Sequence, residues 1–289
     1  MTAQTQKLSV SEIQSAYQTA LREKAPFPLY LKIYEEVAST NSEAFQAAKN
    51  GAPEGTLFLA ESQSAGRGRL KRTWESPPYK NLYLSVILRP PLPIASASQL
   101  TLVAGLACYE ALQPFFQEDV TLPLTPSPRG RGPGGGGKLK LKWPNDLWVH
   151  SKKIGGILSE MDTTAEKLNF VVIGIGLNIN AQEKDFSKNL QKVATSLLME
   201  THQTHSRSQI AGLVLYSFFK NYELYLQEGF ENSRKKWEDC SQMKGQKVKV
   251  QETNRSFEGI CEGLDPSGSL LVKAGNHVEQ VLAGDVIWR

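Results

Sequence analysis

From Lys244 onward the chain changes character, and this change constrains its fold more than any other feature. Short segments alternate apolar and polar residues, and glycines recur between them at Gly259, Gly263, Gly268 and Gly275. Alternation with a period of two is typical of β-strands, and the glycines mark the turns between them. The end of the chain is therefore predicted to form a small all-β barrel that follows a larger domain.

The larger part before Lys244 alternates helical and strand patterns, which proline and glycine separate. We predict helices over 8–24, 42–49, 99–116 and 210–230. We predict strands over 29–37, 56–60, 81–88, 140–143, 148–149, 154–161 and 170–175. These elements are compatible with a mixed α and β domain, but their order does not by itself establish a topology.

Segment 123–140 interrupts this pattern. It holds six glycines and four prolines and has no periodicity, so we predict a flexible insertion in a surface loop. Its run from Gly132 to Lys138 has the spacing of a phosphate-binding loop. However, Leu139 stands where Ser or Thr would bind magnesium, and no strand precedes the run. We therefore expect no nucleotide site here.

Composition excludes several classes of protein. The net charge of +4 is only mildly basic, which does not by itself indicate a nucleic-acid partner. No apolar run approaches the ~20 residues that cross a bilayer, and the N-terminus has no signal-peptide core. The three cysteines are far apart and lack metal-ligand spacing, which predicts reduced thiols. We expect a cytoplasmic protein that binds neither DNA nor a membrane.

The most informative stretch runs from Glu61 to Pro77. It places four basic residues in one glycine-rich loop, namely Arg67, Arg69, Lys71 and Arg72. Glycine lets the backbone approach a ligand, and the guanidinium fork matches phosphate and carboxylate oxygens. Such a loop suits an acyl phosphate anhydride or the triphosphate from which it forms. A basic surface loop that binds nucleic acid or nothing is equally compatible with composition alone.

A second polar cluster follows a proline turn. Asn145 and Asp146 come first, and then Lys152 and Lys153 precede Gly155-Gly156. A lysine beside a strand of small residues can reach a developing negative charge, while the glycines leave room for a ligand. An ordinary turn with two solvated lysines is the alternative, and composition does not separate Lys152 from Lys153.

A third motif runs from Gly174 to Asn178 and superficially resembles a dinucleotide fingerprint. The third glycine is missing, and no helix clearly follows. The motif is therefore weak support for a Rossmann fold.

Taken together, these blocks resemble the biotin–protein ligase family. Their order and spacing match over roughly residues 30 to 289, and the combination is far more specific than any single block. The matching residues are Ser39-Thr40-Asn41, Gln63, Gly66-Arg67-Gly68-Arg69, Arg72, Trp74, Lys142-Trp143-Pro144-Asn145-Asp146, Lys153, Gly155-Gly156 and the segment Gly174–Asn178.

The resemblance implies an α+β fold in which helices flank a central mixed β-sheet, as in class II synthetases, with a C-terminal SH3-like β-barrel. The chain then divides into an N-terminal helical extension (1–28), a catalytic biotin- and ATP-binding domain (29–241) and an SH3-like domain (242–289). The family's reaction has two steps. Biotin and ATP give biotinyl-5′-AMP and pyrophosphate, and a lysine of a biotin carboxyl carrier protein, usually that of acetyl-CoA carboxylase, then takes the biotin and releases AMP.

The resemblance also implies the residues of the site. Biotin would be bound by Ser39, Thr40, Asn41, Gln63, Arg67, Gly68, Arg69, Lys153 and Gly155. ATP and the adenylate would be bound by Arg69, Arg72, Trp74, Asp146 and Asn178. Lys153 and Arg69 would act catalytically by stabilising negative charge at the reacting phosphate, and Asp146 would hold Mg²⁺.

A lipoate–protein ligase or octanoyl transferase of related fold is the closest alternative, although the blocks at 66–69 and 142–146 favour biotin. A nucleic-acid-binding module would use the basic loop and the barrel, but segment 244–289 lacks a dense basic stripe. Some family members carry an N-terminal winged-helix repressor domain. Only 38 residues precede Ser39, so we expect a monofunctional enzyme without operator binding. The sequence does not decide the oligomeric state, and a homodimer through the sheet edge is one alternative.

Overall fold

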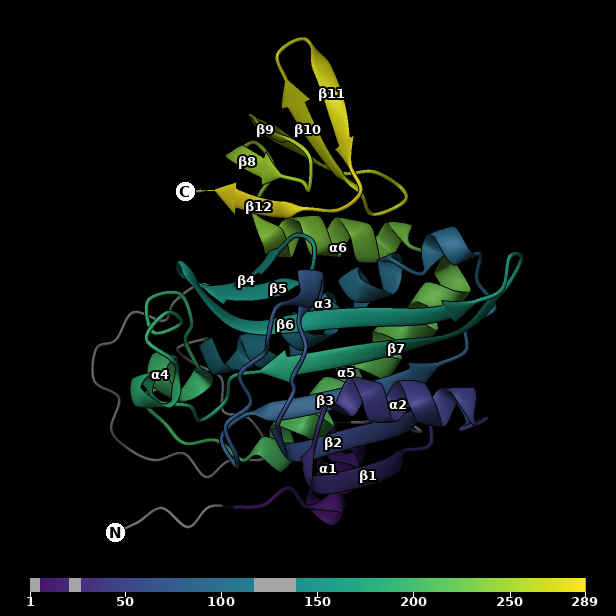
Figure 1. Ribbon diagram of the computed structural model, residues 1–289, viewed down its shortest axis with the longest axis vertical. Coiled ribbons are helices and arrows are strands. Elements are labelled where there is room, and N and C mark those ends of the chain that lie inside the picture. Colours follow the sequence, from purple (N-terminus) through teal and green to yellow (C-terminus); the bar gives the residue numbers. More distant parts are fainter. Residues whose placement is uncertain (1–5, 21–26, 117–138, 289) are drawn as a thin grey trace.

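The computed structural model describes residues 6–20, 27–116 and 139–288. Within these ranges a seven-stranded mixed sheet forms the centre, in the order β1-β2-β3-β7-β6-β5-β4 (Figure 1). Its strands are β1 (Tyr30–Val37), β2 (Thr56–Gln63), β3 (Leu82–Leu88), β4 (Leu139–Lys142), β5 (Asp146–Val149), β6 (Lys152–Thr163) and β7 (Leu168–Leu177). Strands β1 and β2 pair in parallel through a helical crossover, and the remaining neighbours are antiparallel.

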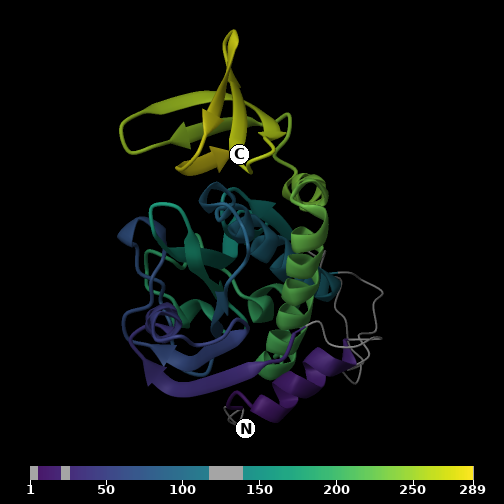
Figure 2. The ribbon, with the colours of Figure 1, turned by 90° about the vertical axis from the view of Figure 1, so that its right-hand side faces the viewer.

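Helices cover both faces of this sheet. The α-helices of the described residues are α1 (Val10–Thr19), α2 (Thr40–Lys49), α3 (Gln99–Leu112), α4 (Leu197–Thr201), α5 (Arg207–Glu228) and α6 (Glu231–Ser241). Short 3-10 helices are η1 (Arg69–Lys71), η2 (Ile94–Ser96), η3 (Gln113–Phe116) and η4 (Glu183–Asp185). Figure 2 shows α5 running along one face, with α2 on the opposite side of the sheet.

Strand alternation separates two apolar cores. On β2, Leu57 and Leu59 belong to the main core, whereas Phe58 between them belongs to a smaller one. The main core is filled from α1, α3 and α5, and α2 covers the smaller one with residues such as Ala44 and Ala48. Because successive strand side chains point to opposite faces, a strand that is apolar throughout must be covered on both sides.

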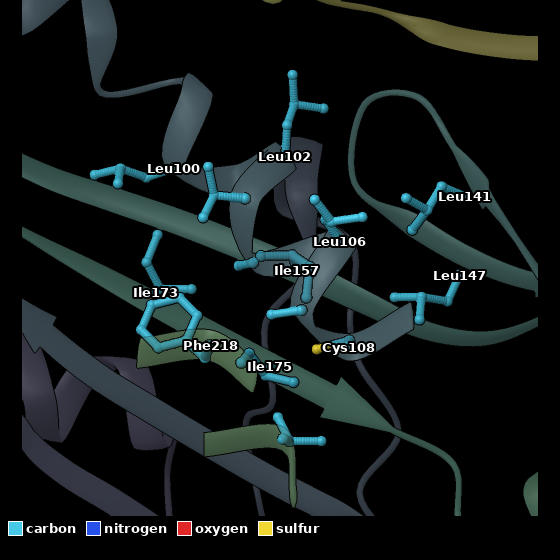
Figure 3. Close-up of a cluster of buried hydrophobic side chains, with 14 of the residues drawn as sticks. Leu100, Leu102, Leu106, Cys108, Leu141, Leu147, Ile157, Ile173, Ile175 and Phe218 are labelled. Carbon is cyan, nitrogen blue, oxygen red and sulfur yellow. The ribbon is translucent and has the colours of Figure 1, made fainter. Parts of the chain in front are cut away.

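The main core lies between α3 and the sheet (Figure 3). Leu106 and Cys108 of α3 lie there with Ile157 of β6 and Ile175 of β7, and all four side chains are buried. Burial raises the pKa of the Cys108 thiol, so this cysteine is an unreactive packing residue. All three cysteines of the chain are free.

The C-terminal segment forms a separate five-stranded antiparallel sheet in the order β11-β10-β9-β8-β12, seen at the top of Figure 1. Its strands are β8 (Lys247–Gln251), β9 (Ser256–Leu264), β10 (Leu270–Ala274), β11 (His277–Val281) and β12 (Asp285–Trp288). On β8, the buried Val248 and Val250 alternate with the exposed Lys247, Lys249 and Gln251. The expected α+β class, with a helix-flanked mixed sheet and a C-terminal SH3-like β-domain, is confirmed.

Several expected elements have different ends, and some were missed. The helix expected to reach Phe116 ends at Leu112 and continues as the 3-10 turn η3, which contains Pro114; proline has no N–H for an α-helical bond. Helix α6 was not predicted. Only three of its eleven residues are buried, namely Ser233, Trp237 and Ser241, so its sequence has almost no apolar periodicity.

The insertion expected over 123–140 lies outside the described residues, except for Leu139 and Lys140, which begin β4. Among the helices that the structure describes, none is both long and apolar enough for a membrane span.

A buried ion pair ties the N-terminal segment to the sheet. Arg207, at the start of α5, and Glu61, on β2, are each 3% exposed in their side chains, and Nη1 lies 2.6 Å from Oε2. Glu61 Oε1 also accepts a hydrogen bond from the backbone N–H of Leu8, and Arg207 Nη2 donates to the carbonyl of Gln6. Both charges are thus satisfied, and both hold the chain before α1 in place.

Replacing Arg207 with Met is expected to lower the free energy of unfolding by about 3–5 kcal/mol, because it strands the Glu61 carboxylate in the interior. Urea unfolding followed by tryptophan fluorescence measures this loss. Lys235→Met removes half of an exposed pair with Glu231 and serves as the control, with no measurable change expected. Equal stability of the two variants would show that the buried pair is dispensable.

Candidate active site

One cavity of about 380 Å³ lies where β6 and β7 meet the N-terminus of α2. Strands β2, β3, β5, β6 and β7 contribute to its wall. Further parts come from residues 39–41 before and in α2, the glycine-arginine loop after β2, the turn between β4 and β5, the loop 186–194, and β12 with the end of β8. Segments far apart in the sequence therefore build one site.

The polar end of the cavity is a connected set of hydroxyl and amide groups. The Thr40 N–H and Oγ1 both donate to Gln63 Oε1, at 2.9 and 3.2 Å, and Gln63 Nε2 donates to Ser76 Oγ at 2.9 Å. Ser39 is the N-cap residue of α2 but makes no side-chain cap bond, so its hydroxyl is available to a ligand. We call Ser39, Thr40, Asn41 and Gln63 the polar floor.

Asn41 has a fixed orientation within this floor. Its Oδ1 lies 2.6 Å from the Ser85 hydroxyl, which can donate to it, and its Nδ2 donates to Glu160 Oε2 at 2.9 Å. A Cβ on Gly174 would come within 2.0 Å of Asn41 Oδ1. The glycine on β7 therefore makes the space that Asn41 occupies.

Two further glycines make room for Trp74. A Cβ on Gly176 would lie 2.6 Å from the Trp74 ring, and one on Gly156 would lie 3.3 Å from it. The indole thus rests on the bare backbone of β6 and β7. The run from Gly174 to Gly176 belongs to the motif that superficially resembles a dinucleotide fingerprint. It is part of strand β7, and the side chains of Asn41 and Trp74 pack against its glycines.

Gly155, which the resemblance assigns to the biotin site, is absent from the cavity wall. Its Cβ would point the other way, to within 2.5 Å of Leu177 and 3.5 Å of Leu147. The reason is strand alternation on β6: Gly156 faces the cavity, so its neighbour must face the core. A bulge shifts this alternation, because Ile154 has no partner on β5. Lys153, three residues before Gly156, therefore lines the cavity as well, whereas Lys152 does not, which separates the two lysines that composition could not.

The glycine-arginine loop spans residues 66–74 and closes over the cavity as a small hairpin. Trp74 N donates to Gly66 O at 2.9 Å, and Gly68 N donates to Arg72 O at 2.7 Å. Gly66 is required at the loop's base, because a Cβ there would lie 2.3 Å from the Trp74 carbonyl oxygen. At the tip, Leu70 has a positive φ of 53° and is exposed.

Three arginines anchor this loop to three different elements. Arg67 Nη2 lies 2.6 Å from Glu160 Oε2 on β6, and Arg69 Nη1 donates to Asn145 Oδ1 at 3.1 Å in the β4–β5 turn. Arg72 forms an ion pair with Asp285 on β12. The loop is therefore held to the sheet and to the C-terminal domain at once.

Positive charge collects in the cavity. Arg67, Arg69, Arg72, Lys142 and Lys153 line it, against the carboxylates of Glu75, Asp146 and Asp285. Lys153 Nζ lies 2.6 Å from Asp146 Oδ1 and 5.4 Å from the centre of the Trp74 ring. Burial lowers the pKa of Arg69 and of Lys142, so both cations are partly desolvated and would gain from an anionic ligand.

Asn178 lines the cavity, but its amide atoms bond the protein. Nδ2 donates to Thr195 O at 3.0 Å, and Oδ1 accepts from Asn81 Nδ2 at 3.3 Å. Lys153 is held to the same segment, because its N–H donates to Val193 O and its carbonyl accepts from Thr195 N. These bonds fix the loop 186–194 against β6.

Sequence reasoning missed that loop and the C-terminal contribution. Phe186, Leu190, Val193 and Ala194 give one side of the cavity an apolar wall, yet they follow no motif. Gln251 and the segment 285–287 come from the C-terminal domain, and only the pairing of Arg72 with Asp285 reveals their role. Every other expected site residue, apart from Gly155, lines the cavity.

The comparisons agree with this geometry. The Biotin/lipoate A/B protein ligase family matches residues 35–178, and the Biotin protein ligase C terminal domain matches residues 245–289. The bifunctional ligase/repressor BirA of Bacillus subtilis is 32% identical over 97% of this chain and 79% of its own. A biotin--[acetyl-CoA-carboxylase] ligase of Mycobacterium tuberculosis is 28% identical over 89% of this chain and 88% of its own.

Among solved structures, a biotin protein ligase from Aquifex aeolicus in complex with biotin and ATP has a TM-score of 0.72 and 27% identity. That match covers 91% of this chain and 99% of the other. The resemblance found in the sequence motifs is thereby confirmed, and this chain belongs to the biotin protein ligase family.

Proposed function

We propose that this chain activates biotin with ATP to biotinyl-5′-AMP and transfers the biotin to a lysine of a biotin carboxyl carrier protein. The observation that supports the proposal is that one cavity contains both the polar floor and a cluster of positively charged side chains. The polar floor suits a ring with N–H donors and a carbonyl acceptor, and the cations beside it suit a carboxylate and phosphates.

The polar floor would hold the ureido ring of biotin. The free hydroxyl of Ser39 and the linked Thr40–Gln63 pair provide donors and acceptors at one end of the cavity. A dithiolane ring, as in lipoate, would leave the Ser39 hydroxyl without a partner and would not use the polar groups beside it, and such a loss discriminates between ligands. The lipoate alternative is therefore less well supported, and the match to the biotin-ligase C-terminal domain points the same way.

The first step forms a bond between a biotin carboxylate oxygen and the α-phosphorus of ATP, and pyrophosphate leaves. Lys153 and Arg69 would be the catalytic residues, because both can place positive charge where negative charge develops on the phosphate. Asp146 holds the ammonium of Lys153 through its ion pair. Asn145 holds the guanidinium of Arg69, so both cations are oriented toward the cavity in advance.

In the second step the neutral amine of the carrier lysine attacks the acyl carbon, and AMP leaves with the bonding electrons. Arg72 and Trp74 would bind the nucleotide part of the adenylate, with Asn178 and the loop 186–194 as its wall. The loop over the cavity would exclude water, which otherwise hydrolyses an acyl adenylate.

Mg²⁺ would enter with the nucleotide. Magnesium in such sites is typically held by one or two carboxylates together with phosphate oxygens and water, and Asp146 supplies one carboxylate beside the cations. Within the described ranges no group of three His, Cys, Asp or Glu side chains converges, so Asp146 would share the ion with phosphate oxygens and water. Bound there, it would offset the charge of the triphosphate.

We also propose a carrier protein and a compartment. Three free cysteines suit a reducing compartment, and the biotin carboxyl carrier of acetyl-CoA carboxylase is the substrate that we assign. We propose a cytoplasmic site of action.

Lys153→Ala and Arg69→Ala are each expected to slow biotin-dependent exchange of labelled pyrophosphate into ATP by about 10²–10³-fold, since each removes charge from the transition state. Lys152→Ala is the matched control, because Lys152 lies outside the cavity wall. Exchange that requires lipoate instead of biotin would contradict the proposed substrate, and an unaffected Lys153→Ala variant would contradict the assigned mechanism.

Thr40→Val keeps the shape of the side chain but removes its hydroxyl from the polar floor. The KM for biotin is expected to rise about 10- to 100-fold, because a buried partner loses its hydrogen bond, while the KM for ATP stays near that of the unaltered chain. Steady-state kinetics measure both. Thr19→Val, on the exposed side of α1, is the control, and equal rises in both KM values would argue against a specific biotin contact.

A further inference from the structure

Glu160 contacts both the glycine-arginine loop and the polar floor, although it does not line the cavity. It lies on β6, and its side chain is 27% exposed. A single oxygen, Oε2, accepts from Arg67 Nη2 at 2.6 Å and from Asn41 Nδ2 at 2.9 Å. One carboxylate thus joins the glycine-arginine loop to the polar floor.

The Arg67 anchor differs from the other two anchors of the loop. Asn145 and Asp285, which hold Arg69 and Arg72, line the cavity themselves, so a bound triphosphate would compete for those arginines. Glu160 is absent from the cavity wall. Glu160 therefore holds Arg67 from outside the cavity, and its carboxylate would not lie against a bound triphosphate.

The contact with Asn41 is equally well defined. Asn41 places its oxygen toward Ser85 and its amide nitrogen toward Glu160. It fills the space beside the Gly174 backbone, where even a Cβ would lie 2.0 Å from its Oδ1. Any movement of Glu160 would therefore change the hydrogen bond that orients Asn41 in the polar floor. A charge-assisted bond to a carboxylate is stronger than a neutral one and fixes this orientation.

We propose that Glu160 is a positioning residue that holds the loop closed through Arg67 and couples that closure to the orientation of Asn41. The proposal deepens the proposed function, since it assigns retention of biotin and its adenylate to a residue outside the cavity. The contacts that close the loop are made by the chain's own side chains, however, so they can be tested without any ligand.

The test compares Glu160→Gln with Asp162→Asn, which makes the same change of charge two residues along β6. Asp162 accepts a bond from Asn169 and touches neither Arg67 nor Asn41. In the ligand-free chain, trypsin cleavage after Arg69, Lys71 and Arg72 reports loop opening. We expect Glu160→Gln to speed this cleavage about fivefold, the scale of one partly exposed charge pair, and Asp162→Asn to leave it unchanged.

A double-mutant cycle makes the result specific to the pair. Arg67→Gln alone should speed cleavage at the remaining sites as much as Glu160→Gln does, and the double variant should add nothing further. Additive effects, or cleavage of Glu160→Gln at the rate of Asp162→Asn, would overturn the proposal. If Glu160→Gln does not fold, Arg67→Gln still tests the loop anchor through the same cleavage sites.

The kinetic readout separates positioning from chemistry. Glu160→Gln is expected to raise the KM for biotin about fivefold while kcat for pyrophosphate exchange stays within about twofold. A fall in kcat at unchanged KM would overturn the positioning role. If the unaltered chain shows no biotin-dependent exchange at all, the proposed function fails, yet the cleavage experiment still decides the role of Glu160.

Discussion

The site depends on the absence of side chains at alternate positions of one central strand. Strand β7 lies between β3 and β6 in the sheet, and its Ile173 and Leu177 face the main core. On its other face Gly174 leaves room for Asn41 and Gly176 for the Trp74 ring. Any larger residue would need a shift of rigid neighbours in a close-packed interior. A polar floor and an indole can thus reach the middle of the sheet.

Closure of the cavity is an electrostatic arrangement among the chain's own side chains. The three loop arginines bond Glu160, Asn145 and Asp285, and Lys153 bonds Asp146. These partners keep the cations in place and offset part of their mutual repulsion. Fixed charges of this kind stabilise a developing phosphate charge without reorganising at the moment of reaction. The C-terminal domain takes part directly, because Asp285 belongs to it.

Local patterns predicted most of the fold and much of the site. The alternating strands, the long helix α5 and the switch to short strands near Lys244 all follow from periodicity within a few residues. The motif residues of the polar floor and of the loop line the cavity because they are close in sequence to strand ends. Helix α6 escaped prediction because it buries almost only Trp237, which leaves no periodic signal.

The rest required contacts between distant segments. Gly155 and Gly156 are indistinguishable in composition, and only the register of β6 against β7 decides which one faces the cavity. The apolar wall at 186–194 exists because its backbone bonds Lys153. The role of Asp285 depends on the docking of the C-terminal domain, because Asp285 is more than two hundred residues from Arg72 in the sequence. No local pattern encodes these three pairings.

The central claim is that one closed cavity makes and protects a biotinyl adenylate. The most direct measurement incubates the chain with biotin and ATP, removes free ligands by gel filtration, and identifies the retained molecule by mass spectrometry. The account predicts retained biotinyl-5′-AMP, which disappears when a carrier protein with its acceptor lysine is added. Retention of lipoyl-AMP in a competition between biotin and lipoate, or release of the adenylate into solution as fast as it forms, would contradict it.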